Sequence, residues 1–349
     1  MADRPISSPT VGVIGAGSFG TAISNLLAYN TDVLLYSRNE EQVENINLTH
    51  HHQGVELSPR IRATADLQEV AEGCRLIFPV VPSDNFRQLM RDFSPFLRPY
   101  HLLIHGTKGF DLQRPEHELE DAPFTPEHVH TMSQVILEET VVVRVGCLSG
   151  PNLAREIMDG QPTATVIASR FKEVIESGKQ ALTSRHFQVF GTYELLGAEL
   201  AGALKNAIAI GSGILGGLGM GKNIQALLIT RGLMEMIRFG RAMGASPQAF
   251  VGTAGIGDLV CTATSTNSRN YTFGMRLGRG EDPETIKATM PELAEGVRTI
   301  ALTRRLAEYY KLQVPITEML YRVVYDGHPI DKAIEYLMRY PYYVDVDFF

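Results

Sequence analysis

The segment VGVIGAGSFG, residues 11–20, decides the fold of the first half of the chain. An apolar run leads into Gly15, Gly17 and Gly20 in the spacing GxGxxG, and a helical pattern follows directly. In a strand–turn–helix unit, such glycines permit a tight turn, close backbone approach to a pyrophosphate and close helix–strand packing. The N–H groups at the start of the helix would then face the phosphates. The segment predicts a dinucleotide site, with a purely structural glycine turn as the alternative.

Apolar runs and helical patterns alternate beyond this segment as far as about Glu194. This alternation is typical of a doubly wound parallel sheet covered by helices on both faces. After Glu194 the patterns are helical to near the C-terminus. We therefore predict an α/β Rossmann-like domain over residues 1–194 and an all-α domain over residues 195–349. No linker rich in Pro or Ser separates them, which favours closely packed domains with a cleft between them. Segment 111–128 is expected to be a surface loop, whereas the aromatic end, 340–349, gives no clear pattern.

Composition restricts the class of protein. With 349 residues the chain is too long for one ordinary hydrophobic core, so two domains are expected. A composition of 44% hydrophobic and 20% charged residues is typical of a soluble globular protein. A net charge of −7 argues against nucleic acid as the main partner. Three cysteines without a CxxC pair suit free thiols in a reducing compartment. Residues 201–218 are apolar enough for a membrane span, but Lys205 and Asn206 interrupt them, so a buried core helix is favoured. A cytoplasmic enzyme follows as the starting class.

The end of the second predicted strand, LLYSRN at residues 34–39, bears on the choice of cofactor. An acidic residue at this place would hold the ribose hydroxyls of NAD. The chain has Ser37 and Arg38 there, which can hold a 2′-phosphate, so NADP is favoured over NAD. The alternatives are a solvated arginine and a ribose contact from Glu40 or Glu41.

Lys205 is the one charged residue within LAGALKNAIAIGSG, residues 200–213. Its ammonium could reach water while its stem packs, or it could be functional, because a buried lysine is costly without a role. Lys108 follows another predicted strand, at the edge where doubly wound sheets bind ligands. Asp258 precedes Ser268, Arg269 and Asn270 at a predicted helix start, a set of donors that suits a phosphate.

The chain closely resembles the bacterial-type glycerol-3-phosphate dehydrogenases that use NAD or NADP. The resemblance covers nearly the whole chain and rests on ordered motifs: GAGSFGTA (15–22), VVPSDNFR (80–87), GTKGF (106–110), LSGPNLARE (148–156), GALKNAIAI (202–210), GIGDLVCTATSTNSRNYTFG (255–274) and AEGVRT (294–299). It implies reversible reduction of dihydroxyacetone phosphate to sn-glycerol 3-phosphate for glycerophospholipid synthesis. It also implies a homodimer.

The same resemblance implies roles for single residues. Lys205 matches the proton-transfer lysine, and Lys108 matches a lysine that touches both cofactor and substrate. Asp258 would hold or balance the charge of Lys205. Matches to substrate contacts are Gly150, Asn152, Asp258, Ser268, Arg269 and Asn270. Matches to cofactor contacts, besides the three glycines, are Ser18, Phe19, Arg38, Ala154, Arg269, Leu293 and Glu295.

Three features of the sequence stand apart from this pattern. Asn152 replaces the Ser or Thr common in the family, the segment after Phe110 is longer, and THHHQGVEL (49–57) replaces a stretch with tyrosine and proline. The triplet His50–His52 lacks a second ligand cluster, so it predicts an exposed turn and no metal site. Two other functions remain open: a dehydrogenase of a hydroxy acid or ketopantoate-like substrate, and a dinucleotide-binding regulatory module without catalysis.

Overall fold

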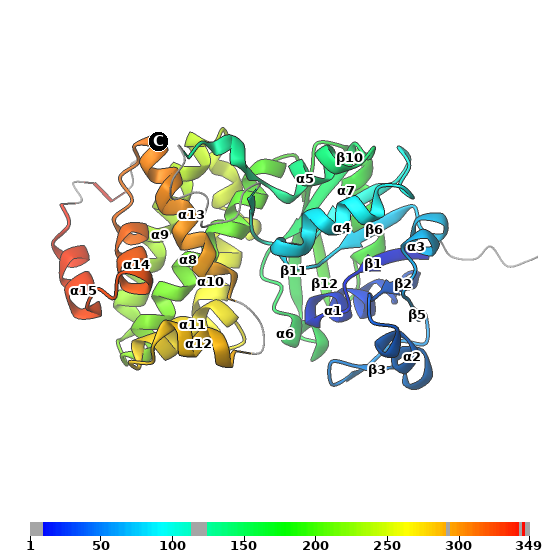
Figure 1. Cartoon of the computed structure of the whole chain (residues 1–349), viewed down its shortest axis with the longest axis horizontal. Helices are drawn as coiled ribbons and strands as arrows, with labels where there is room; N and C mark the ends of the chain where they lie inside the picture. The colour runs from blue at the N-terminus through cyan, green and yellow to red at the C-terminus, as the bar shows by residue number, and fades with distance from the viewer. Residues whose placement is uncertain (1–9, 113–123, 291–293, 342–343, 346–349) are drawn as a thin grey trace, which may run out of the picture. The chain divides into compact units, whose positions relative to one another are not determined.

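The computed structural model describes residues 10–112, 124–290, 294–341 and 344–345. The chain divides into two compact units, Met1–Thr107 with Met132–Leu195, and Lys108–Thr131 with Leu196–Phe349. Strands dominate the first unit and helices the second (Figure 1).

A single sheet forms the centre of the first unit. In the described residues it has eight strands, which pair in the order β12 (Phe187–Thr192), β11 (Thr163–Ser169), β10 (Arg144–Ser149), β7 (Leu102–His105), β6 (Leu76–Pro79), β1 (Thr10–Ile14), β2 (Asp32–Tyr36) and β5 (Ile61–Thr64). From β5 to β10 this is the 3-2-1-4-5-6 order of a doubly wound fold. The strand order reverses at β1, so the glycine-rich turn after β1 lies at the switch point where such sheets bind ligands.

The sheet differs from the predicted all-parallel arrangement at one junction. β10 and β11 pair antiparallel, with Gly146 opposite Ser169, while β11 and β12 run parallel to each other. No crossover helix returns the chain between β10 and β11: the connection holds only the short α6 (Ala154–Met158). A parallel pairing needs a crossover that returns along the length of the strand, usually through an α-helix, and the five-residue α6 is too short for that return.

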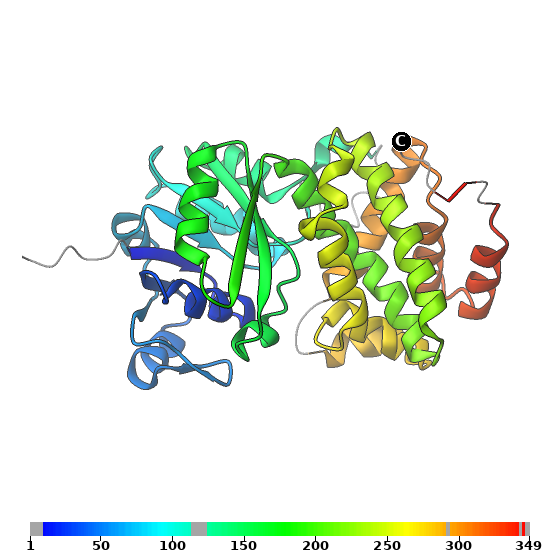
Figure 2. The same ribbon diagram turned by 180° about the vertical axis from the view of Figure 1, so that it is seen from behind.

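Both faces of the sheet are covered, because its buried residues alternate between two hydrophobic clusters. Val33 and Leu35 of β2 join one cluster, whereas Leu34 joins the other. The first cluster holds residues of α1 (Ser18–Leu27), α2 (Glu40–Thr49), α6 and α7 (Lys172–Leu182), and the second holds residues of α3 (Leu67–Gly73), α4 (Phe86–Phe93) and α5 (Met132–Glu139). Figure 1 shows α4 and α5 in front of the strands, and Figure 2, from behind, shows α7. A two-residue spacing in each strand therefore builds a core on each face.

The second unit is built around α8 (Leu195–Gly217), which carries Lys205. Its other described helices are α9 (Lys222–Ala242), α10 (Asp258–Thr264), α11 (Arg269–Gly278), α12 (Pro283–Thr289), α13 (Glu295–Tyr310), α14 (Pro315–Tyr325) and α15 (Ile330–Arg339). The unit also has the short helical turns η3 (Pro126–His128), η4 (Pro247–Phe250) and η5 (Thr253–Gly257), and the first unit has η1 (Ser83–Asn85). By length and composition α8 could cross a membrane, but 89% of its apolar window is buried inside the protein. That burial is typical of a core helix.

The boundary predicted at Glu194 is close to the start of α8, but the structure adds an earlier segment to the helical unit. Lys108–Thr131 belongs there, with the short hairpin strands β8 (Asp111–Leu112) and β9 (Val129–His130). Phe110 and Val129 are buried in the helical core, which explains the assignment. Part of the predicted surface loop, residues 113–123, lies outside the described residues, as does most of the C-terminal end.

Glycines let α8 and α11 pack backbone against backbone. A Cβ on Gly213 would lie 2.1 Å from the carbonyl oxygen of Tyr271, and one on Gly274 would lie 2.0 Å from that of Ile210. Gly217 and Gly278, four residues further along each helix, are equally confined. Because backbone cannot move aside as a flexible side chain can, this contact fixes the first turn of α11 relative to Lys205.

Replacing Gly274 with Ala should destabilise the helical unit. The added Cβ would overlap the Ile210 carbonyl, and overpacking of a tight core costs about 1–3 kcal/mol. Denaturant or thermal unfolding would measure the loss. Gly73→Ala is the matched control, because a Cβ at the end of α3 meets nothing within 4 Å. Equal stability of the two variants would contradict the proposed close packing.

Candidate active site

The glycine-rich turn of the first unit leaves space for a ligand against the backbone. Gly15 has φ +116°, a conformation that favours glycine, and a Cβ on Gly20 would lie 1.8 Å from the Gly15 carbonyl oxygen. Gly17 caps the N-terminus of α1, and a Cβ there would meet nothing within 4 Å. Ser18 and Phe19 form the first turn of α1. A helix N-terminus beside open space fits a pyrophosphate.

The three residues after β2, Ser37, Arg38 and Asn39, include a cation and no acidic residue. Ser37 is buried and its hydroxyl bonds to Gln42, whereas Arg38 is exposed. The side chain of Asn39 caps α2 by accepting from Gln42 N–H at 3.0 Å. The nearest acids in sequence, Glu40 and Glu41, are already in the first turn of α2.

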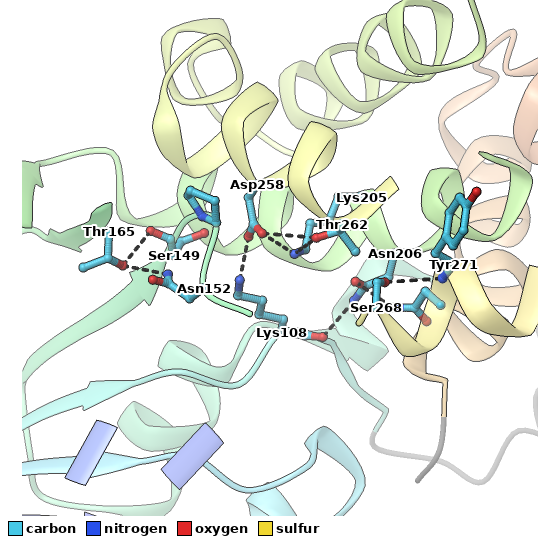
Figure 3. Close-up of polar contacts among 12 residues, drawn as sticks. Lys108, Ser149, Asn152, Thr165, Lys205, Asn206, Asp258, Thr262, Ser268 and Tyr271 are labelled. Carbon is cyan, nitrogen blue, oxygen red and sulfur yellow. Dashed lines mark hydrogen bonds and ion pairs between the residues drawn. The ribbon is translucent and has the colours of Figure 1, made fainter. Parts of the chain in front are cut away.

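A second polar group in the first unit centres on Asn152. The Thr165 hydroxyl donates to the Ser149 carbonyl at 3.1 Å and accepts from Asn152 Nδ2 at 2.9 Å (Figure 3). The donor role of Thr165 fixes which way the amide of Asn152 points. The other amide atom, Asn152 Oδ1, is buried with no hydrogen-bond partner among the described residues. Such an oxygen suits a donor supplied by a ligand. Gly150, at φ +141°, and Ala154, the first residue of α6, flank it.

In the second unit, Asp258 is bonded to both predicted catalytic lysines (Figure 3). Lys108 Nζ donates to Asp258 Oδ2 at 2.6 Å, and Lys205 Nζ donates to Asp258 Oδ1. Lys205 also donates to the Thr262 hydroxyl at 2.6 Å. The side chains of Lys205 and Asp258 are only 4% and 2% exposed, against 19% for Lys108. The ammonium of Lys205 therefore does not reach out to water, and its charge is balanced inside the protein.

Local structure places Asp258 at this point. The π-helical turn Thr253–Gly257 runs directly into α10, and Asp258 is the first residue of that helix. Thr262 lies one turn later on the same face of α10. π-Helical turns are rare and frequently occur at functional sites.

Burial and charge act against each other on this cluster. Burial lowers the pKa of Lys205 to about 8, Lys108 adds to the lowering, and Asp258 opposes it. For Asp258, burial alone would raise the pKa, but the charges of Lys108 and Lys205 outweigh burial and hold the pKa below its ordinary value. The site thus keeps a carboxylate ionised beside a lysine that can change its charge near neutral pH.

A chain of amide hydrogen bonds connects Asn270 with the backbone at Lys108. Gly296 N–H donates to Asn270 Oδ1 at 2.9 Å, and Asn270 Nδ2 donates to Asn206 Oδ1 at 3.0 Å. Asn206 Nδ2 then donates to the Lys108 carbonyl at 3.3 Å. The backbone donor at one end and the backbone acceptor at the other fix both amide orientations. Asn206 was not predicted as a site residue, although its polarity in an apolar helix was a signal.

The remaining predicted residues of this unit lie at helix starts. Ser268 caps α11 by accepting from the Tyr271 N–H at 3.3 Å, and Arg269 is the exposed first residue of that helix. Glu295 is the first residue of α13. Leu293 lies outside the described residues.

The histidine triplet was predicted to be an exposed turn and not a metal site, and the cysteines to be free of disulfides. Within the described residues, no group of three or more His, Cys, Asp or Glu side chains could hold a metal ion. The prediction of an exposed turn is wrong in part: His51 is exposed and bonds to the carbonyl of Thr49, but His50 and His52 are half-buried, and residues 51–52 form a short strand. The three cysteines form no disulfide: Cys74 and Cys147 are buried, and Cys261 is half-buried.

Comparisons with known proteins agree over both units. The N-terminal model of the NAD-dependent glycerol-3-phosphate dehydrogenases matches residues 10–175, and the C-terminal model matches residues 194–335. A glycerol-3-phosphate dehydrogenase, NAD(P)+, from Azotobacter vinelandii is 39% identical over 348 residues, covering 98% of each chain. The protein of that name from Geobacter sulfurreducens is 40% identical over 95% of this chain and 97% of its own.

Solved structures extend the comparison. The crystal structure of glycerol-3-phosphate dehydrogenase from Coxiella burnetii has a TM-score of 0.85 at 29% identity, covering 96% of this chain and 100% of that chain. A ketopantoate reductase from Ralstonia eutropha has a TM-score of 0.59 at 16% identity, covering 93% of this chain and 99% of that chain. The latter likeness concerns the fold alone.

The charge of Lys205 should titrate with a midpoint near 8, well below the ordinary value of 10.5. Between these values the folded protein binds fewer protons than the unfolded chain, so this group makes the free energy of unfolding rise with pH. NMR of 15N-labelled lysine side chains measures the midpoint. Asp258→Asn should lower it further, because Asp258 favours the charged form. A Lys205 that titrates with the exposed lysines would contradict the assignment.

Proposed function

The chain belongs to the NAD-dependent glycerol-3-phosphate dehydrogenase family, and from this membership we propose how its residues perform the reaction. The protein is an NAD(P)-dependent glycerol-3-phosphate dehydrogenase, which reversibly reduces dihydroxyacetone phosphate to sn-glycerol 3-phosphate. The product is the backbone of glycerophospholipids. The observation that carries the mechanism is the buried Asp258 carboxylate bonded to both Lys205 and Lys108.

When bound, the reduced nicotinamide supplies the hydride to the carbonyl carbon of the substrate. The protein must then deliver a proton to the carbonyl oxygen and stabilise negative charge there. Lys205 is suited to be the general acid, since its pKa of about 8 lies near neutral pH. Asp258 and the Thr262 hydroxyl hold the Lys205 ammonium in place.

Lys108 is suited to stabilise the developing oxyanion. It shares Asp258 with Lys205, and its side chain is more exposed, so a ligand can reach it. When hydride transfer runs in the opposite direction, neutral Lys205 accepts the proton from the alcohol. While both lysines are charged, they hold the pKa of Asp258 below its ordinary value, so its carboxylate stays ionised.

We assign recognition of the substrate phosphate to the start of α11. Arg269 offers a planar set of charged donors, and the N–H groups of the first helical turn add to it. Asn270 is held by Asn206 and Gly296 and so has a fixed amide. Ser268 completes this subsite. Gly150 and Asn152 are assigned to the substrate as well, with the unpartnered Asn152 Oδ1 accepting from a hydroxyl group.

For the cofactor, the proposed contacts are the glycine-rich turn with Ser18 and Phe19, together with Arg38, Lys108, Ala154, Arg269, Leu293 and Glu295. NAD and NADP are both used. NADPH is preferred, because Arg38 is exposed after β2 where an acid would repel a 2′-phosphate. We further propose a homodimer on the family resemblance, and a place in the cytoplasm on the three cysteines that form no disulfide.

Lys205→Ala should abolish turnover while cofactor affinity stays nearly unchanged. Loss of a well-placed proton donor costs at least ~10²-fold in rate. Initial rates with dihydroxyacetone phosphate, together with NADH fluorescence titration, separate the two effects. A variant that retains a tenth of wild-type turnover would refute the assignment.

Arg269→Ala should raise the KM for dihydroxyacetone phosphate about ten- to a hundredfold, because a hydrogen bond to a charged group contributes about 1.5–3 kcal/mol. Dihydroxyacetone without the phosphate is the control substrate. It should be poor for the wild type and little affected by the substitution. Equal losses with both substrates would make Arg269 a structural or cofactor residue instead.

Arg38→Ala should weaken NADPH selectively. Removing a charge–phosphate contact costs about 1–3 kcal/mol, whereas NADH lacks the 2′-phosphate and should keep its kcat/KM within a few-fold. Steady-state kinetics with both cofactors decide the matter. An equal loss for both would indicate stacking on the adenine, and no loss would remove Arg38 from the site.

A further inference from the structure

A histidine from a distant hairpin donates a hydrogen bond to the glycine-rich turn. His52 Nε2 lies 2.7 Å from the carbonyl oxygen of Ala16, the residue between Gly15 and Gly17. A carbonyl oxygen can only accept, so the proton of this bond is on Nε2. His52 is half-buried and lies 36 residues along the chain from Ala16. The exposed His51 beside it makes no such contact and bonds within its own turn.

The hairpin that carries His52 is anchored independently of this bond. It consists of β3 (His51–His52) and β4 (Val55–Glu56). Asn25 of α1 binds the end of β4 and the residues after it: Nδ2 donates to the Glu56 carbonyl at 3.0 Å, and Oδ1 accepts from Ser58 N–H at 3.0 Å. Leu57 is buried in the core of the first unit. Because the hairpin is already held, the His52 bond acts on the turn.

The bond fixes the direction of one peptide plane. In a trans peptide the carbonyl and the next N–H point to opposite sides, so an Ala16 carbonyl directed at His52 turns the Gly17 N–H away from it. Gly17 is exposed, and space is open beside it. Without the histidine, the carbonyl could rotate toward that space and present a lone pair to an anion.

We propose that His52 is a positioning residue for the dinucleotide pyrophosphate, acting through the Ala16–Gly17 peptide. The proposal rests on the proposed function, in that it takes the glycine-rich turn as the pyrophosphate site. The effect is common to NAD and NADP, because both carry the pyrophosphate. Arg38 is assigned to the 2′-phosphate, so its effect is expected for NADP and not for NAD.

Equilibrium binding to the whole protein tests the proposal with fragments of the cofactor. ADP-ribose contains the pyrophosphate without a 2′-phosphate, and adenosine 2′-monophosphate contains the 2′-phosphate without the pyrophosphate. His52→Ala should weaken ADP-ribose, NADH and NADPH equally, by about two- to tenfold, the worth of one hydrogen bond. Adenosine 2′-monophosphate should bind as before. Arg38→Ala should give the reverse pattern for the two fragments.

Two further variants separate positioning from folding. His51→Ala, on the same strand, is the matched control and should bind all four ligands like the wild type. His52→Gln retains an N–H donor and should recover much of the lost ADP-ribose affinity. In the wild type, 15N NMR should find the His52 proton on Nε2, with exchange slowed by ADP-ribose. This measurement remains decisive if His52→Ala does not fold.

Unchanged ADP-ribose affinity in His52→Ala, an equal loss of adenosine 2′-monophosphate, or a proton on Nδ1 alone would overturn the role of His52. In each case the wild type still binds ADP-ribose, so the dinucleotide site stands. Failure of the wild type to bind ADP-ribose, NADH or NADPH would overturn the proposed function together with this inference.

Discussion

The buried carboxylate of Asp258 is the group on which the helical unit's site depends. A lysine as deeply buried as Lys205 loses its hydration, and only a compensating charge with well-placed acceptors makes its ammonium tolerable. Asp258 supplies that charge and shares it with Lys108. With both lysines charged, the cluster carries one positive charge in excess, which in the proposed mechanism stabilises the substrate oxygen as it becomes negative. In the proposed mechanism, stability and chemistry therefore depend on the same three side chains.

The position of this cluster follows from how closely the helices approach. Gly213 and Gly217 of α8 face backbone atoms of α11, and Gly274 and Gly278 of α11 face backbone atoms of α8. The start of α11, with its exposed Arg269, is thereby held at a fixed offset from Lys205. Hydrogen bonds from Asn270 to Asn206, and from Asn206 to the Lys108 carbonyl, connect the start of α11 with the backbone at Lys108. Groups from three segments are thus oriented by backbone packing and amide hydrogen bonds, and sites built on helices are more precise than sites on loops.

The glycine-rich turn of the first unit also depends on residues from a distant segment. Its glycines give the turn its shape, but the direction of the Ala16 carbonyl is set by His52 from another segment. The Ser149–Thr165–Asn152 group likewise fixes an amide and leaves one oxygen without a partner. In both places hydrogen bonds outside the predicted motif orient the groups that a ligand would meet.

The sequence by itself determined the α/β class, the glycine-rich turn, the helical second half and Lys205 as an unusual charge, because hydrophobic periodicity and glycine spacing are local properties. It did not determine that Lys108–Thr131 belongs to the helical unit, since that depends on which core buries Phe110 and Val129. Nor could it reveal the antiparallel β10–β11 pair or the partners of Asn206 and His52. Those are contacts between segments far apart in the chain, and only the packing of the folded protein decides them.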